Sequence, residues 1–155
     1  MSIKAQVEAW SACLPELQAF FPKHAETYSA ASKHFVFEPR YDVYSQLEQA
    51  GALLVITLRD YGKLIGYWVA IVTPDLRFRD CLTATADFWH IEPEYRAKAA
   101  PLILMRAVER EYQARGVTRS FAGENLAHPS GRLFKAFGYQ PSETYYEKFI
   151  GTSHA

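Results

Sequence analysis

The sequence predicts an α/β fold with a mixed, mostly antiparallel central sheet flanked by helices. Three observations support this prediction. Helical periodicity dominates residues 10–49, apolar β-branched and aromatic runs fill residues 52–91, and helix and strand then alternate to the C-terminus. This order favours an antiparallel front to the sheet, followed by one strand–helix–strand crossover whose two strands run parallel.

The first third of the chain is predicted to be helical. Apolar side chains recur at three- and four-residue spacing over residues 10–21, and Pro22 marks the expected end of that helix. Residues 24–35 form a less regular piece. Residues 41–49 are predicted as a short helix that Gly51 terminates.

The pattern then changes to the period of strands. Residues 52–72 hold two apolar runs around Asp60-Tyr61-Gly62-Lys63, which predicts a β-hairpin, and residues 81–91 are a third strand. The remaining elements are expected as a helix over 101–115 with Leu102 on its apolar face, a strand within 117–125, a short helix within 128–139 and a final strand over 143–150.

The composition fits a single soluble globular domain. Of 155 residues, 49% are apolar and 22% charged, and 17 basic side chains balance 17 acidic ones, which gives no support for DNA, RNA or anionic membranes as partners. The chain has neither a run of about 18 apolar residues nor a signal-peptide layout, so we expect no membrane span and a cytoplasmic location. Cys13 and Cys81 match no metal spacing, and no metal site is expected.

The segment EPEYRAKAAP, residues 92–101, joins a strand to a helix, where ligands of α/β folds tend to bind. The first N–H groups of a helix lack internal partners and the helix dipole is positive there, so the turn is a candidate anion site. Arg96 and Lys98 add positive charge. Its alanines do not easily take a positive φ, and its proline removes one N–H. A phosphate site and a plain helix-start loop with solvated cations both stay open.

Several local strings follow one another in a specific order: DYGKLIGYWVAIV, DFWHIEPEYR, LILMRAVEREYQARGV and LFKAFGYQPSETYYEKFI. With these strings the chain resembles the GNAT acyltransferases (Gcn5-related N-acetyltransferases) from about His24 to the C-terminus. FFPKHAETYS and YDVYSQLEQAGAL are similar to the small GNAT-like proteins of tailed phages and prophages. The resemblance implies one GNAT-like domain over residues 1–155, with a helical part (1–50) covering the acceptor side and a sheet and cofactor-binding core (51–155).

The resemblance also implies that the turn holds the pyrophosphate of acetyl-CoA, the acyl-CoA co-substrate. The family pattern Q/R-x-x-G-x-G/A reads here Arg96-Ala97-Lys98-Ala99-Ala100-Pro101, so alanine and proline stand at the two small positions. Asn125 is expected to contact the pantetheine arm, with an Asx turn as the alternative. The cofactor-binding residues implied are Ile91, Arg96, Ala97, Lys98, Ala99, Ala100 and Asn125.

Asp87 is the catalytic base that the resemblance implies, because amine acetylation needs a group that takes a proton from the ammonium. A carboxylate within TADFW is expected to be partly desolvated, which favours its protonated form. A structural aspartate, hydrogen-bonded to backbone or hydroxyl groups, is the alternative. His90 is a second titratable candidate, and its spacing from Asp87 along a regular strand predicts that the two face opposite sides of the sheet.

The resemblance is weakest at the general acid. The family's usual tyrosine position holds Phe134, and Tyr139, Tyr145 and Tyr146 are the nearby phenols. His24 and Glu26 lie in the region that usually covers the acceptor, so they are the candidate substrate-binding residues, although two residues apart they do not share one helical face. Exposed charges without a role are the alternative for this pair.

The resulting hypothesis is an acyl-CoA-dependent N-acyltransferase, using acetyl-CoA, that transfers an acyl group to an amine of a small molecule or protein by direct attack. The alternative is a GNAT-fold phage protein without catalysis that serves as a virion or host-interaction component, because fold alone does not establish chemistry. GNAT-like chains often dimerise, so the resemblance allows a homodimer.

Overall fold

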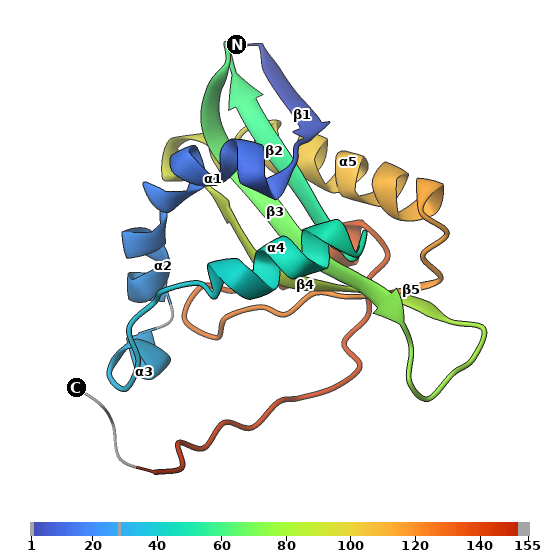
Figure 1. The fold of residues 1–155 in the computed structure, drawn as a ribbon. Coiled ribbons are helices and arrows are strands. Elements are labelled where there is room, and N and C mark those ends of the chain that lie inside the picture. Colours follow the sequence, from blue (N-terminus) through green and yellow to red (C-terminus); the bar gives the residue numbers. More distant parts are fainter. Residues whose placement is uncertain (1, 28, 152–155) are drawn as a thin grey trace. The chain divides into compact units, whose positions relative to one another are not determined.

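The computed structural model describes residues 2–27 and 29–151 and is built on a five-stranded sheet of order β1-β2-β3-β4-β5 (Figure 1). The first three pairings are antiparallel and the last, between β4 and β5, is parallel. The predicted mixed, mostly antiparallel sheet is therefore confirmed. The strands are β1 (Ile3–Val7), β2 (Leu53–Asp60), β3 (Lys63–Pro74), β4 (Leu82–Ile91) and β5 (Arg119–Phe121).

The chain divides into two compact units. The first consists of Met1–Leu14 and Arg40–Gly123 and contains the whole sheet, α4 (Tyr41–Gln49) and α5 (Ala100–Ala114). Within this unit α5 packs against β1 to β4 on one face of the sheet, while α4 packs against β2 on the other face (Figure 1). Since α5 connects β4 to β5, it is the crossover helix that the parallel pair requires.

The second unit consists of Pro15–Pro39 and Glu124–Ala155. Aromatic side chains of this unit pack on one another, such as Phe21 of α2 against Phe37 at 5.7 Å and His34 against Phe149 at 4.0 Å between ring centroids. α1 (Trp10–Gln18) begins in the first unit and ends in this one; the other helices here are α2 (Phe21–Thr27), α3 (Ser29–Ser32) and α6 (Gly131–Ala136). The single domain over residues 1–155 stays a prediction.

The N-terminal third departs from the prediction in two ways. Ile3–Val7 is the edge strand β1, because its pairing with β2 outweighs the helical tendency of the local sequence. The helix expected over residues 10–21 ends at Gln18, and Pro22 lies in the first turn of α2, where a missing N–H costs no helical hydrogen bond.

The C-terminal strand predicted over residues 143–150 is wrong, since the structure has no regular secondary structure there. Tyr145 and Tyr146 are 84% and 94% exposed. Alternation of side chains is a necessary condition for a strand, but a strand also needs a partner to receive its backbone hydrogen bonds. Leu102, expected on the apolar face of α5, is also exposed, because the buried face runs through Ala100, Leu104 and Val108 instead.

The predicted hairpin between β2 and β3 is confirmed. Asp60 pairs with Lys63, and the two residues between them, Tyr61 and Gly62, have φ values of 48° and 86°. Positive φ at both positions matches the right-handed twist of the flanking strands. Four residues further on, Gly66 lies so close to β4 that a Cβ atom would come within 2.7 Å of the backbone oxygen of His90. The sheet therefore requires glycine at position 66.

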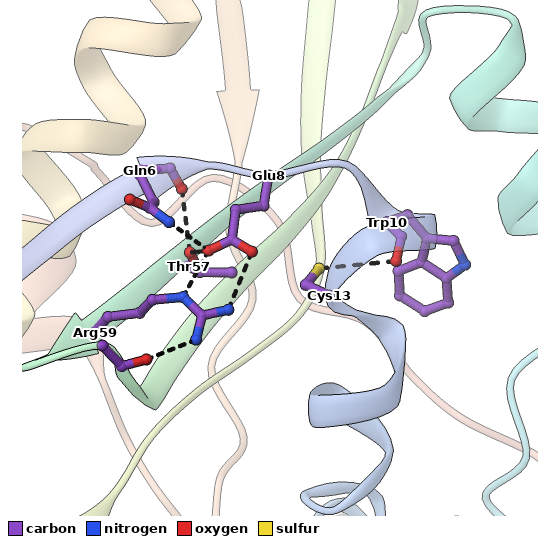
Figure 2. A network of polar contacts seen from close by, with 7 residues as sticks. Gln6, Glu8, Trp10, Cys13, Thr57 and Arg59 are labelled. Atoms are coloured by element: carbon purple, nitrogen blue, oxygen red, sulfur yellow. Dashed lines mark hydrogen bonds and ion pairs between the residues drawn. The ribbon is translucent and has the colours of Figure 1, made fainter.

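A polar network fastens β1 to β2 (Figure 2). Glu8 accepts hydrogen bonds from Arg59 Nε at 2.7 Å and Arg59 Nη2 at 3.0 Å, and from the side chains of Gln6 and Thr57. The hydrogen bond from Arg59, more than any other cause, lowers the pKa of Glu8 from its ordinary 4.5 to about 2. The pair is mostly shielded from solvent, so it contributes more than a surface salt bridge would.

We expect Gly66→Ala to lower the free energy of unfolding by about 1–3 kcal/mol, because backbone of β4 must move to admit the methyl group. Gly123→Ala is the matched control, since nothing lies within 4 Å of the Cβ position there. Chemical denaturation measures both. Equal stability of the two variants would contradict the close approach.

We expect Glu8→Gln to lower the free energy of unfolding by about 1–3 kcal/mol at pH 7, because charge-assisted hydrogen bonds to Arg59 are lost. The folded-state pKa of Glu8 lies below the unfolded value, so this stabilisation is present above pH 4.5 and is lost as the pH falls toward 2. Denaturation series from pH 7 to pH 2 should show the gap between the two proteins closing. A gap independent of pH would refute the assignment.

Candidate active site

β4 carries one extra residue in the middle of its pairing with β3. Val69 pairs with Phe88 and Ala70 with Ala86, which leaves Asp87 without a partner in the register. A bulge of this kind bends the strand and changes the direction of the side chains that follow. On its other edge, β4 pairs with β5 only from Thr83 to Thr85, and no described strand continues that pairing along residues 86–91.

The bulge places Asp87 and His90 on the same side of the sheet, so the expectation of opposite faces is wrong. Tyr44 on α4 donates its hydroxyl hydrogen to Asp87 Oδ2, and its ring lies 6.0 Å from that of Phe88. Phe88 in turn lies 5.9 Å from Tyr67, whose ring is 6.0 Å from that of His90. The simple alternation rule fails because it assumes a strand without an inserted residue.

Asp87 is exposed rather than desolvated, which corrects the expectation drawn from its aromatic neighbours. The hydroxyl partner that the structural alternative requires is present in Tyr44. Within the described residues, however, Oδ1 of Asp87 accepts no hydrogen bond. The carboxylate is thus held through one oxygen and open at the other, as a group that receives a proton from a bound amine would be.

The Tyr44 ring is supported from behind by Trp10, the first residue of α1. The two rings stack with centroids 4.5 Å apart and an interplanar angle of 18°, and the Trp10 ring meets Phe88 edge-on at 6.4 Å. Trp10 is 1% exposed, and its Nε1 has no hydrogen-bond partner among the residues described. An unsatisfied buried donor costs about 1–3 kcal/mol, so ring packing must hold the indole in place.

The turn after β4 has no left-handed residue. A short 3₁₀ helix, η1 (Pro93–Tyr95), leads into it, and Ala99, the N-cap of α5, has φ −71° and ψ −13°. In the described part of the chain, Tyr61 is the only non-glycine residue with a positive φ. Alanine is therefore not strained in this turn, because the backbone stays in the right-handed region that alanine prefers.

Several backbone N–H groups of the turn are open. Tyr95, Arg96 and Lys98 donate back into the turn, and Ile103 makes the first hydrogen bond of α5, to the oxygen of Ala99. Pro101, at the start of α5, has no N–H, and its fixed φ suits the first helical turn. No hydrogen bond within the described residues is made by the N–H groups of Ala97, Ala99, Ala100 and Leu102. Ala97, Ala99 and Leu102 are exposed, whereas Ala100 is fully buried, so its N–H group does not face solvent.

Two cations flank these N–H groups. Arg96 donates from Nε to the backbone oxygen of Ile91 at 2.7 Å, which fixes the guanidinium at the end of β4, and neither Nη atom has a partner in the described ranges. The ammonium of Lys98 lies 5.2 Å from the centre of the Tyr95 ring. Tyr95 is anchored by donating its hydroxyl hydrogen to Asp60 at 3.1 Å. Open amides at a helix start with a fixed arginine form a site for an anion such as a phosphate.

The other predicted site residues lie in the second unit. Asn125 donates from Nδ2 to the backbone oxygen of Thr27 at 2.9 Å and accepts from the N–H of Ala127 at 2.8 Å, which is the Asx turn given as its alternative. His24 is 2% exposed and stacks on Phe37, whereas Glu26 is exposed, so the two do not share a surface. Their roles in binding cofactor or acceptor stay predictions.

The structure brings no obvious general acid to the family position. Phe134 is buried against Tyr139, with ring centroids 5.6 Å apart.

In the part of the chain that the structure describes, no group of three or more His, Cys, Asp or Glu side chains could hold a metal ion. Nor is any helix there long and apolar enough to cross a membrane.

Tyr44 and Trp10 are the site residues that sequence reasoning missed. Tyr44 lies 43 positions before Asp87, and Trp10 precedes the helix that carries Tyr44. Each looks like an ordinary core aromatic along the chain. Only the packing of α4 and the start of α1 shows that the Tyr44 hydroxyl meets the exposed carboxylate and that Trp10 stacks on the Tyr44 ring.

The family model described as "Acetyltransferase (GNAT) family" matches residues 10–139. No curated protein sequence matches the chain. Many solved structures share the fold of this chain at low sequence identity, so their similarity concerns the fold alone.

Three of these structures illustrate the range. An aminoglycoside acetyltransferase from an uncultured soil metagenomic sample has a TM-score of 0.74 at 13% identity, covering 97% of this chain and 100% of that one. A ribosomal-protein-alanine N-acetyltransferase from Brucella melitensis biovar Abortus has 0.64 at 14%, with the same coverages. AAC(6')-Iy, in complex with a bisubstrate analog of CoA and acetylneamine, has 0.61 at 17%, again over 97% and 100% of the chains.

Proposed function

Because the chain belongs to the GNAT acetyltransferase family, we propose that it is an N-acyltransferase that transfers the acetyl group of acetyl-CoA to an amine. The observation that carries this proposal is the turn between β4 and α5. Three exposed residues at this turn and helix start, Ala97, Ala99 and Leu102, have backbone N–H groups without a partner in the described chain, and the turn also carries the fixed guanidinium of Arg96. This is the donor arrangement that a pyrophosphate needs, and the glycine-free sequence forms it without backbone strain.

The residues proposed to hold the cofactor divide by the kind of contact they offer. Ala97 and Ala99 offer exposed backbone N–H groups, whereas that of Ala100 becomes accessible only if the turn opens. Arg96 and Lys98 offer positive charge, and Ile91 ends the strand beside which the pantetheine arm would run. Since no strand of the described chain pairs with the outer edge of residues 86–91, an extended ligand can pair there. Asn125 is retained as a proposed contact, provided that it exchanges one of its hydrogen bonds.

The proposed reaction is direct attack. Asp87 accepts a proton from the bound ammonium, and the neutral nitrogen attacks the thioester carbonyl carbon. The C–N bond forms, the C–S bond breaks, the nitrogen releases its second proton to water, and CoA leaves as a thiolate that takes a proton from water. A thiol with a pKa of about 8.5 leaves without strong help from an acid, so Phe134 at the family's acid position does not prevent the reaction. Catalysis then rests on positioning and on the proton acceptor.

The acceptor is proposed to be a cationic amine, because an exposed carboxylate attracts an ammonium group. Two amines are suitable acceptor probes. An aminoglycoside follows the name of the soil-metagenome aminoglycoside acetyltransferase, and a peptide with N-terminal alanine follows the name of the Brucella ribosomal-protein-alanine N-acetyltransferase. His24 and Glu26 are proposed to shape the acceptor side. Release of the CoA thiol with each probe tests the activity.

We expect Arg96→Ala to weaken acetyl-CoA binding by about tenfold or more, because charge-assisted hydrogen bonds to a phosphate are lost. Isothermal titration calorimetry with acetyl-CoA measures the effect. Arg106→Ala is the matched control: it removes the same charge from the exposed side of α5, away from the turn. Equal affinities of the two variants would rule out the turn as the pyrophosphate site.

We expect Asp87→Asn to lower kcat/KM for the amine by about 10²- to 10⁴-fold, because the amide cannot take the ammonium proton. Affinity for acetyl-CoA should not change, since Asp87 lies on β4 before the turn. Steady-state rates of thiol release and a parallel calorimetric titration provide both values. An unchanged kcat/KM would show that Asp87 is not the base.

A further inference from the structure

We propose that Tyr44 is the positioning residue for Asp87. Its hydroxyl holds Oδ2 of the carboxylate so that Oδ1 faces the acceptor amine. This inference rests on the proposed function, in which Asp87 takes the ammonium proton. It goes beyond that function by assigning a second residue, from a helix 43 positions away in sequence, to the same chemical step.

Asp87 needs an external support because of where it lies. As the extra residue of the bulge, it has no partner on β3, and its side chain is exposed to solvent. An exposed carboxylate without a neighbour rotates among several rotamers, and a misplacement of about 1 Å can cost about 10²-fold in rate. The bond from Tyr44 is the only hydrogen bond that the described residues make to this carboxylate.

Tyr44 is itself held on two sides. Trp10 stacks on its ring at 4.5 Å, and Phe88, the residue after Asp87, meets it edge-on at 6.0 Å. The indole nitrogen of Trp10 has no hydrogen-bond partner in the described chain, so a polar contact does not explain why the indole lies there. The contacts of the indole ring with Tyr44 and Phe88 explain its position. They fix the plane of the Tyr44 ring and hence the position of its hydroxyl.

The backbone beneath Tyr44 is also ordered. The N–H of Tyr44 donates to the oxygen of Arg40 at 3.0 Å, in the first turn of α4, and α4 packs against β2. Gly51 follows the helix with φ 69°, which ends α4 cleanly before β2 begins. Tyr44 therefore reaches Asp87 from a helix that packs against the sheet and ends at a glycine.

The chemical consequence is a carboxylate with two unequal oxygens. Oδ2 is occupied by the tyrosine hydroxyl, whereas Oδ1 has no partner among the residues described. An incoming ammonium therefore meets one oxygen in one orientation and can align its lone pair, once deprotonated, with the thioester. The hydroxyl takes no part in bond making or breaking, so Tyr44 acts through Asp87 and not on the substrate.

The test is a double-mutant cycle of Tyr44→Phe and Asp87→Asn in the full chain, with acetyl-CoA and an aminoglycoside as the probes. Tyr44→Phe keeps the ring that packs on Trp10 and Phe88 and removes only the hydroxyl. We expect it to lower kcat by about 10- to 100-fold without changing the KM for acetyl-CoA or the melting temperature. In the Asp87→Asn background the same change should have no further effect. Tyr61→Phe, in the exposed hairpin turn, is the matched control.

The outcomes separate this inference from the proposed function. If Asp87→Asn is inactive while Tyr44→Phe retains full kcat, the positioning role is wrong and the proposed function stands. If Asp87→Asn is fully active, the proposed base itself is wrong, and the positioning role falls with it. If the two losses multiply in the double variant, Tyr44 acts independently of Asp87, which overturns the inference.

A crystal structure of Tyr44→Phe provides a readout that needs no activity. We expect the Asp87 carboxylate to rotate away from its position or to occupy several rotamers, while the substituted ring at position 44 stays stacked on Trp10. A carboxylate that keeps its wild-type orientation without the hydroxyl would overturn the positioning role, whatever the kinetic result.

Discussion

The bulge in β4 is the constraint on which the rest of the candidate site depends. By inserting Asp87 between the paired residues Ala86 and Phe88, it turns that carboxylate to the side of the sheet where α4 and the start of α1 lie. Without the extra residue, regular alternation would place Asp87 and His90 on opposite faces. The meeting of Tyr44 with both Asp87 and Phe88 is the direct consequence of this irregularity.

The second constraint is the conformation of the turn that follows. Glycine is valuable in anion-binding loops where the backbone needs a positive φ. Here the chain passes from η1 to α5 in the right-handed region, so alanine fits, and the helix start still leaves its N–H groups open. The absence of glycine from this turn therefore does not by itself exclude an anion site. The arginine at position 96, held at the end of β4 by Ile91, supplies charge beside the open N–H groups.

Most of the sheet could be predicted from the sequence, because its central strands are continuous apolar runs and its hairpin turn carries a glycine. The parts that could not be predicted from the sequence depend on partners that are distant in the chain. β1 exists because β2 offers an edge to it, and residues 143–150 are not a strand although they alternate. In the candidate site, Asp87 and Arg96 are candidates that the resemblance implies, but the bulge and the contacts of Tyr44 and Trp10 depend on tertiary packing, which periodicity does not encode.

The central claim is that a glycine-free turn serves as the pyrophosphate site of an acetyl-CoA-dependent enzyme. A crystal structure of the full chain with acetyl-CoA tests it most directly. The account predicts pyrophosphate oxygens at about 3 Å from backbone nitrogens at the turn and helix start, among Ala97, Ala99 and Leu102, with Arg96 beside them. Acetyl-CoA bound elsewhere, with those N–H groups still facing water, would contradict it.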